Sequence, residues 1–73
     1  MASVSVKSEI AGKVWKIETK VGDSIEEEGQ IMILESMKME IPVFAPRAGT
    51  IKAILVAEGE TIAEGQPVAT LET

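Results

Sequence analysis

Two stretches of the sequence, AGKVWKIETKVGDSI at residues 11–25 and AGTIKAILVAEGETI at residues 48–62, decide the fold because they are two copies of one pattern. The second copy follows the first at an offset of 37 residues, and no gap is needed anywhere in the chain to keep this register. Paired glycines in an ungapped register indicate an internal repeat rather than chance similarity. The identical pairs are Val6 with Val43, Ala11 with Ala48, Gly12 with Gly49, Ile17 with Ile54, Gly22 with Gly59, Ile25 with Ile62, Glu27 with Glu64, Leu34 with Leu71 and Glu35 with Glu72.

The repeated unit has the pattern of β-structure. Apolar and β-branched runs of about four to eight residues are separated by Gly, Pro and acidic turns, which is typical of strands. No long stretch keeps a helical period. The predicted strands are Val4–Lys7, Lys13–Val21, Ile31–Glu35, Met39–Phe44, Thr50–Ala57 and Pro67–Glu72.

A bulge is predicted near the start of each repeat. Apolar residues follow Gly12 at the second and fifth positions, Val14 and Ile17, and the same spacing follows Gly49. A spacing of three residues breaks the two-residue period of a strand, so we expect a bulge or a sharp bend after both glycines.

Two kinds of turn are predicted within each repeat. Gly22 and its counterpart Gly59 are each followed by an acidic residue, and they predict turns that need a residue tolerant of positive φ. The next turn breaks the repeat, because Gly65 is matched by Glu28 and a glycine appears one place later, at Gly29. We therefore expect the first of these two turns to be built differently from the second and to deviate most from the symmetry.

These features predict an all-β fold. Two copies of a unit with one apolar side can bury those sides against each other, which gives a flattened β-barrel or sandwich of two antiparallel sheets with pseudo-two-fold symmetry. A chain of 73 residues has room for one small domain. We expect a single domain over residues 1–73, with repeat halves at about 1–36 and 38–73.

The composition excludes several classes of function. The chain has no Cys and no His, which removes disulfides, thiolate chemistry, the commonest general base and zinc sites of Cys and His. The acidic residues do not follow the spacing of a calcium loop, so no metal site is predicted. A net charge of -5 disfavours nucleic acid and anionic membranes as partners. No stretch is long enough to span a bilayer and no signal-peptide pattern is present, so a cytoplasmic location is expected.

The sequence ESMKME at residues 35–40 lies where the first repeat passes into the second. It separates the predicted strands Ile31–Glu35 and Met39–Phe44, so Lys38 is expected at or near the tip of a hairpin. A lysine in that position holds its amine in water, where another protein can surround it.

These six residues resemble the biotin-attachment signature of the biotinyl/lipoyl attachment domain family, which includes the biotin carboxyl carrier proteins. The signature is a lysine between two methionines, preceded by Ala or Ser and, before that, by Glu. The resemblance covers essentially the whole chain, and it implies a barrel-sandwich hybrid fold with the modified lysine on a hairpin turn. Further matching segments, in the family's order, are Val21-Gly22-Asp23 with Ile25, Ala45-Pro46, Ala48-Gly49-Thr50 and Glu58-Gly59-Glu60.

By this resemblance, Lys38 is the residue whose amine forms an amide with the carboxylate of biotin, and a biotin protein ligase is the modifying partner. The domain then shuttles carboxybiotin between the sites of a biotin carboxylase and a carboxyltransferase. It is a carrier and not an enzyme. Lysine plus biotin forms an arm with a reach on the order of 10–15 Å, estimated from about ten bonds.

The neighbours of Lys38 are interpreted through the same resemblance. Met37 and Met39 are ligase recognition residues in this interpretation, because solvent-facing hairpin tips rarely carry two adaptable thioethers. The alternative is hydrophobic filling beside a strand. Ser36, Glu35 and Glu40 complete the flanking motif, and the two glutamates either help to dock the ligase or are solvated charges at strand ends.

Two other functions remain open for this chain. A lipoyl carrier, or a dual acceptor of biotin and lipoate, would use the same lysine, but lipoyl domains that resemble this chain usually place Asp before the lysine and Ala after it. A purely structural interaction domain would leave Lys38 unmodified. Catalysis by the chain itself is disfavoured because it has no His, no Cys and no Gly-rich phosphate loop. We expect the isolated domain to be monomeric.

Overall fold

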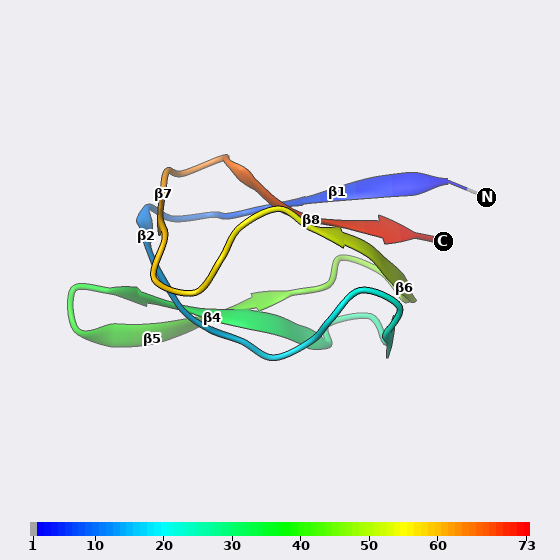
Figure 1. The fold of residues 1–73 in the computed structure, drawn as a ribbon, viewed down its shortest axis with the longest axis horizontal. Coiled ribbons are helices and arrows are strands. Elements are labelled where there is room, and N and C mark those ends of the chain that lie inside the picture. Colours follow the sequence, from blue (N-terminus) through cyan, green and yellow to red (C-terminus); the bar gives the residue numbers. More distant parts are fainter. Residues whose placement is uncertain (1) are drawn as a thin grey trace.

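A computed structural model describes residues 2–73 and folds them into two antiparallel four-stranded sheets without a helix (Figure 1). One sheet has the strand order β1-β8-β6-β3 and the other β5-β4-β2-β7. The predicted all-β sandwich is therefore confirmed. Within the described residues, no helix is long and apolar enough to cross a membrane. The strands are β1 (Ser3–Lys7), β2 (Gly12–Ile17), β3 (Ser24–Ile25), β4 (Gln30–Ser36), β5 (Met39–Phe44), β6 (Gly49–Ile54), β7 (Thr61–Ile62) and β8 (Pro67–Glu72).

The 37-residue repeat is present in the strand pairing. The pairs β1–β8, β2–β4 and β3–β6 are matched by β5–β4, β6–β8 and β7–β2. Their registers also correspond, since Ser3 lies opposite Glu72 just as Glu40 lies opposite Glu35. Each sheet takes two strands from each half, so the halves interleave rather than each forming a sheet of its own. Neither half can bury its apolar side without the other.

The predicted bulges are confirmed. The register of β2 against β4 shifts between Val14 and Lys16, and that of β6 against β8 shifts between Ile51 and Ala53. One extra residue at each bulge allows Val14 to be fully buried while Ile17, three positions on, still packs against the core.

Two predicted strands are longer than the observed ones. The strand predicted over Lys13–Val21 ends at Ile17, and the strand predicted over Thr50–Ala57 ends at Ile54. Beyond these points the chain leaves one sheet and crosses to the other. It then pairs there for only two residues, in β3 and β7, which were not predicted as strands.

Gly22 and Gly59 lie at the ends of the two crossings, and both have the positive φ that was predicted for them. Gly22 has φ 97° and donates its N–H to the carbonyl of Ile51 at 2.8 Å, while Gly59 has φ 90° and donates to the carbonyl of Val14 at 2.7 Å. Because the two bonds are equivalent under the 37-residue offset, the crossings join the sheets symmetrically.

The prediction that the turn at Glu28 differs from the turn at Gly65 is wrong. Glu28 has φ 65° and Gly65 has φ 82°, so both residues are left-handed. The N–H of Glu28 donates to the carbonyl of Ala45, and the N–H of Gly65 donates to that of Ser8, both at 2.8 Å. The turn keeps its shape because these bonds fix the backbone, and Glu28 bears a strain of about 1–2 kcal/mol that glycine would avoid.

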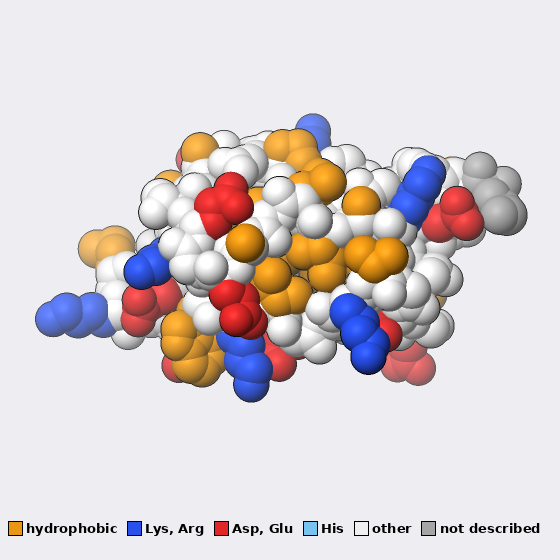
Figure 2. Space-filling model, in the orientation of Figure 1, with side chains coloured by type: hydrophobic (Ala, Val, Ile, Leu, Met, Phe, Trp, Pro, Cys, Tyr) orange, Lys and Arg blue, Asp and Glu red, His pale blue; other side chains and the backbone are white. Residues whose placement is uncertain are grey.

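The core fills the space between the sheets and draws on both repeats. Figure 2 shows hydrophobic side chains lying between the two layers, where one edge of the sandwich is open. The molecule is elongated, with principal extents of 36 × 18 × 18 Å. The buried apolar residues are Val6, Val14, Ile25, Ile31, Met32, Leu34, Val43, Ala45, Ile51, Val56, Ile62, Val68, Ala69 and Leu71.

Candidate functional site

The β4–β5 hairpin places Lys38 at one end of the long axis. Ser36 lies opposite Met39 and forms the last pair of the hairpin, so Met37 and Lys38 are the two residues of the turn. The predicted hairpin position of Lys38 is confirmed. Figure 1 shows this turn at the opposite end of the molecule from the two chain termini.

The turn holds its two residues in an unusual backbone conformation. Met37 has φ 52° and Lys38 has φ 65°. Positive φ at both central residues defines a type I′ turn, which follows the right-handed twist of the strands and is usually built from Asn and Gly. An L-residue with a side chain pays roughly 1–2 kcal/mol for the left-handed conformation. The hairpin therefore tolerates strain to keep two long side chains at its tip, and such strain clusters at functional sites.

The side chains at the tip project into solvent, while those at the base are anchored. Met37 is 90% exposed and Met39 is 60% exposed, and Lys38 is also exposed. Three positions before the turn, Leu34 is buried in the core and lies opposite the partly buried Ile41. The tip is thus a short projection from a fixed base, and its position does not depend on contacts of its own side chains.

Gly12 supports the base of the hairpin, a role that was not predicted. A Cβ at Gly12 would lie 2.8 Å from the carbonyl oxygen of Glu35 and 3.4 Å from the Cβ of Ser36. β2 therefore approaches β4 closely beside the tip because residue 12 has no side chain. The signal that could have indicated this role is the repeat itself, since a Cβ at Gly49 would lie 2.7 Å from the carbonyl oxygen of Glu72 in the same way.

The charged residues of the motif lie beside the tip and do not form a reactive cluster. Glu35 and Glu40 are exposed and lie directly opposite each other in the hairpin, and Lys13 lies opposite Glu35 on the other side. Ser36 is half-buried. In the described part of the chain, no group of Asp and Glu residues could hold a metal ion. The arrangement can present an amine, but it shows no metal centre within residues 2–73.

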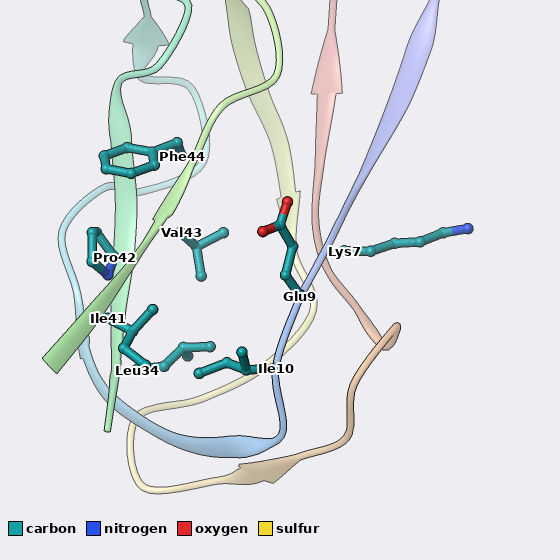
Figure 3. Close-up of a pocket in the computed structure, with 8 residues that line it drawn as sticks. All are labelled: Lys7, Glu9, Ile10, Leu34, Ile41, Pro42, Val43 and Phe44. Carbon is teal, nitrogen blue, oxygen red and sulfur yellow. The ribbon is translucent and has the colours of Figure 1, made fainter. Parts of the chain in front are cut away.

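A pocket of about 140 Å³ opens beside the hairpin at the edge of the sandwich. It lies between β5 and the segment after β1, with the carboxylate of Glu9 facing Val43 across it (Figure 3). Pro42 and Phe44 lie on the other side of β5 from Val43. The lining residues are Lys7, Glu9, Ile10, Leu34, Ile41, Pro42, Val43 and Phe44.

Ala2 and Thr73, the first and last residues that the structure describes, meet at the end of the molecule farthest from Lys38. Ala2 and Thr73 exchange two backbone hydrogen bonds, at 3.0 and 2.9 Å. Under the repeat, this pair corresponds to Ser36 with Met39, the pair that closes the hairpin. The molecule therefore has the same strand pairing at both ends. At one end the paired strands are joined by the turn that carries Lys38, and at the other end the paired residues Ala2 and Thr73 are not joined.

A β-sandwich that presents one exposed lysine on a strained hairpin turn has the arrangement expected of a carrier domain, which holds an attached group for other proteins to act on. Residues 1–71 match the family model of biotin/lipoyl domains, described as "Biotin-requiring enzyme". The chain therefore belongs to the biotin/lipoyl attachment family, whose domains are non-catalytic carriers.

Individual relatives agree with this family. The chain is 45% identical over 62 residues to the biotin/lipoyl attachment protein of Bacillus subtilis, which covers 85% of each chain. It is 37% identical to the biotin carboxyl carrier protein of Streptococcus mutans, matching 96% of this chain and 54% of the relative. Its fold superposes on part of the urea carboxylase of Kluyveromyces lactis with a TM-score of 0.93 at 32% identity, covering 99% of this chain and 6% of the carboxylase.

Proposed function

We propose that this chain is a biotin carrier, that biotin is attached to the Nζ of Lys38, and that the attached group carries carboxylate between a biotin carboxylase site and a carboxyltransferase site. The observation that carries the proposal is the turn, in which Lys38 is presented at the tip of the β4–β5 hairpin in a strained conformation. A structural role alone would favour Asn and Gly at these two positions.

The position of Lys38 separates it from the other lysines. The others lie on the body of the sandwich, on a strand or in the crossing between β2 and β3, where an enzyme cannot surround the side chain from several directions. Only the tip allows the amine to enter a deep active site. These other lysines are Lys7, Lys13, Lys16, Lys20 and Lys52.

Attachment joins the Nζ of Lys38 to the carboxyl carbon of biotin. The ligase activates that carboxyl group, the amine attacks it, the leaving group departs from the carbon, and a base of the ligase takes the proton from the nitrogen. The resulting arm of about 10–15 Å lets the ring sweep a region around the tip. Tethering of this kind raises the effective concentration of the group at a nearby site to about millimolar.

The neighbours of Lys38 guide recognition by the ligase. Met37 and Met39 together offer two flexible thioethers on either side of the amine, and their exposure favours contact with a partner over packing inside this domain. Glu35 and Glu40 add negative charge at the base of the tip, while Ser36 closes the hairpin against Met39.

Intact-mass measurement tests the proposal. The chain is expressed with an active biotin ligase and an active lipoate ligase, and we expect the mass increment of one biotinyl group in the unaltered chain and none in Lys38→Arg. Lipoate is the second candidate, because the Bacillus subtilis relative is named for both groups. A lipoyl increment as the main product would replace biotin in this proposal, and an unmodified chain would refute it.

A further inference from the structure

The outer face of the sheet that carries the hairpin has an apolar patch that the core does not require. Ile33 lies opposite Pro42 and next to Lys16, so these three residues share the outer face. Trp15 is the extra residue of the β2 bulge and is 49% exposed, and Phe44 on β5 is 52% exposed. We name the four residues Trp15, Ile33, Pro42 and Phe44 the apolar face.

The repeat provides an internal control for this face. The positions equivalent to Trp15, Ile33, Pro42 and Phe44 on the other sheet carry Lys52, Thr70, Ser5 and Lys7. These four residues stand in the same strand pairing, since Ser5 lies opposite Thr70 as Pro42 lies opposite Ile33. Because polar side chains satisfy the fold at every equivalent position, the apolar face is not a requirement of the architecture. Exposed apolar groups that gather on one side typically mark an interaction site.

The apolar face begins a short distance from Lys38 on the same hairpin. Pro42 is four residues beyond Lys38 along β5, which corresponds to roughly 13 Å at the rise of a strand. A standard protein interface buries about 800 Å² on each partner, which is a disc with a radius of roughly 16 Å. A partner that covers Lys38 from this side therefore reaches the apolar face. Figure 2 shows hydrophobic side chains on the outer side of this layer, toward the end with the turn.

The pocket extends the same surface around the edge of the sheet. β5 is an edge strand with the apolar face on its outer side, and the pocket opens along the same edge, with Val43 on its inner side and Pro42 and Phe44 also among its lining residues (Figure 3). Pro42 lies in the middle of β5 and has no backbone N–H, which disfavours the addition of a strand here, so we expect a partner to bind through side chains. A partner that wraps β5 finds apolar surface on both sides, including a recess for an aliphatic side chain.

We propose that the apolar face is the docking surface for the biotin protein ligase, an inference that rests on the proposed function of Lys38. The ligase meets the domain before biotin is attached, so it must recognise the protein surface. Its matching surface is expected to be apolar at the centre, acidic where it approaches Lys13 and Lys16, and basic where it approaches Glu35 and Glu40. The carboxylase sites meet a tethered group and depend less on docking.

The repeat also supplies the substitutions for the test. Trp15→Lys, Ile33→Thr and Phe44→Lys each install the residue that already stands at the equivalent position of the other sheet, so they are compatible with the fold. Trp15→Ser and Phe44→Ser remove the apolar groups without adding charge. A double control, Lys52→Ala with Ser5→Ala, changes the polar face of the other sheet.

Biotinylation kinetics with the ligase that modifies the unaltered chain provide the readout, with a thermal melt of each variant. The triple variant combines Trp15→Lys, Ile33→Thr and Phe44→Lys. We expect it to raise the KM for the domain at least tenfold with kcat within about twofold of the unaltered chain. We expect each Ser variant to raise the KM several-fold. The control should match the unaltered chain. A reduced kcat with unchanged KM would overturn the docking role.

The remaining outcomes distinguish failure of the proposed function from failure of the docking proposal alone. If the unaltered chain accepts no biotin, the proposed function fails and the docking proposal fails with it. If it is biotinylated and the apolar-face variants match it in KM, only the docking proposal is refuted. If biotinylation is unchanged but carboxylation of the attached biotin falls, the face binds a carboxylase component instead. A dimer that the triple variant dissociates in size-exclusion chromatography would assign the face to a second copy of this chain.

Discussion

Replacement of Lys38 with glycine is expected to stabilise the domain while it removes the attachment site. Lys38 has φ 65°, and the left-handed conformation costs a residue with a side chain roughly 1–2 kcal/mol. Glycine avoids this cost but raises the entropy of the unfolded chain, which offsets about 0.4–1 kcal/mol. The net gain is on the order of 0.5–1 kcal/mol. For a domain of this size, that raises Tm by roughly 2–8 °C.

Alanine at the same position isolates the backbone contribution. Lys38→Ala removes the same exposed side chain but keeps the left-handed strain, so its free energy of unfolding should stay within about 0.5 kcal/mol of the unaltered chain. Urea denaturation and thermal melts of the three proteins measure the difference. If Lys38→Gly is no more stable than Lys38→Ala, the turn is not strained, and strain does not mark the functional tip.

Other substitutions separate folding from attachment. Gly59→Val places a β-branched residue at φ 90° with nothing within 4 Å of its Cβ, so its cost comes from backbone strain. Urea denaturation should show a decrease of about 1–3 kcal/mol in the free energy of unfolding, while streptavidin captures the folded fraction as before. A decrease of less than about 0.5 kcal/mol would contradict this. Gly12→Val should lower the free energy of unfolding by about 1–3 kcal/mol and also slow biotinylation of the folded protein, because its Cβ would clash with the base of the hairpin. An unchanged biotinylation rate would show that this base does not position the tip. Met37→Asp combined with Met39→Ala should leave Tm almost unchanged, but intact-mass measurement should show a shift of the modification from biotin to lipoate. Equal biotinylation of the variant and the unaltered chain would mean that the two methionines serve only as hydrophobic packing.

The repeat made most of the fold predictable from the sequence. The ungapped offset of 37 residues predicted the symmetry, and the apolar spacing after Gly12 and Gly49 predicted the bulges. The crossings were not predicted, because Ile17, Thr19 and Val21 place a β-branched residue at every second position, as a strand does. Only tertiary contacts take this segment out of one sheet and into the other.

The backbone conformation of non-glycine residues was the second feature that could not be predicted from the sequence. Glu28 adopts the conformation of its glycine counterpart because hydrogen bonds to distant residues hold it there, and a sequence pattern contains no such information. The position of Lys38 on a hairpin was predictable from the repeat boundary, but the type I′ turn at Met37 and Lys38 was not. The apolar face was also missed, because it gathers residues from β2, β4 and β5 that alternate with core residues in the sequence.

The assignment of Lys38 as the attachment site is tested by streptavidin capture of the chain after expression with an active biotin ligase, followed by peptide mapping of the captured protein. We expect one biotin, located on Lys38, in the unaltered chain. We expect no capture of Lys38→Arg, whose thermal melt should match that of the unaltered chain because the side chain is exposed. Capture of Lys38→Arg through another lysine, or a melt that collapses in this variant, would contradict the assignment of Lys38 as the exposed attachment site.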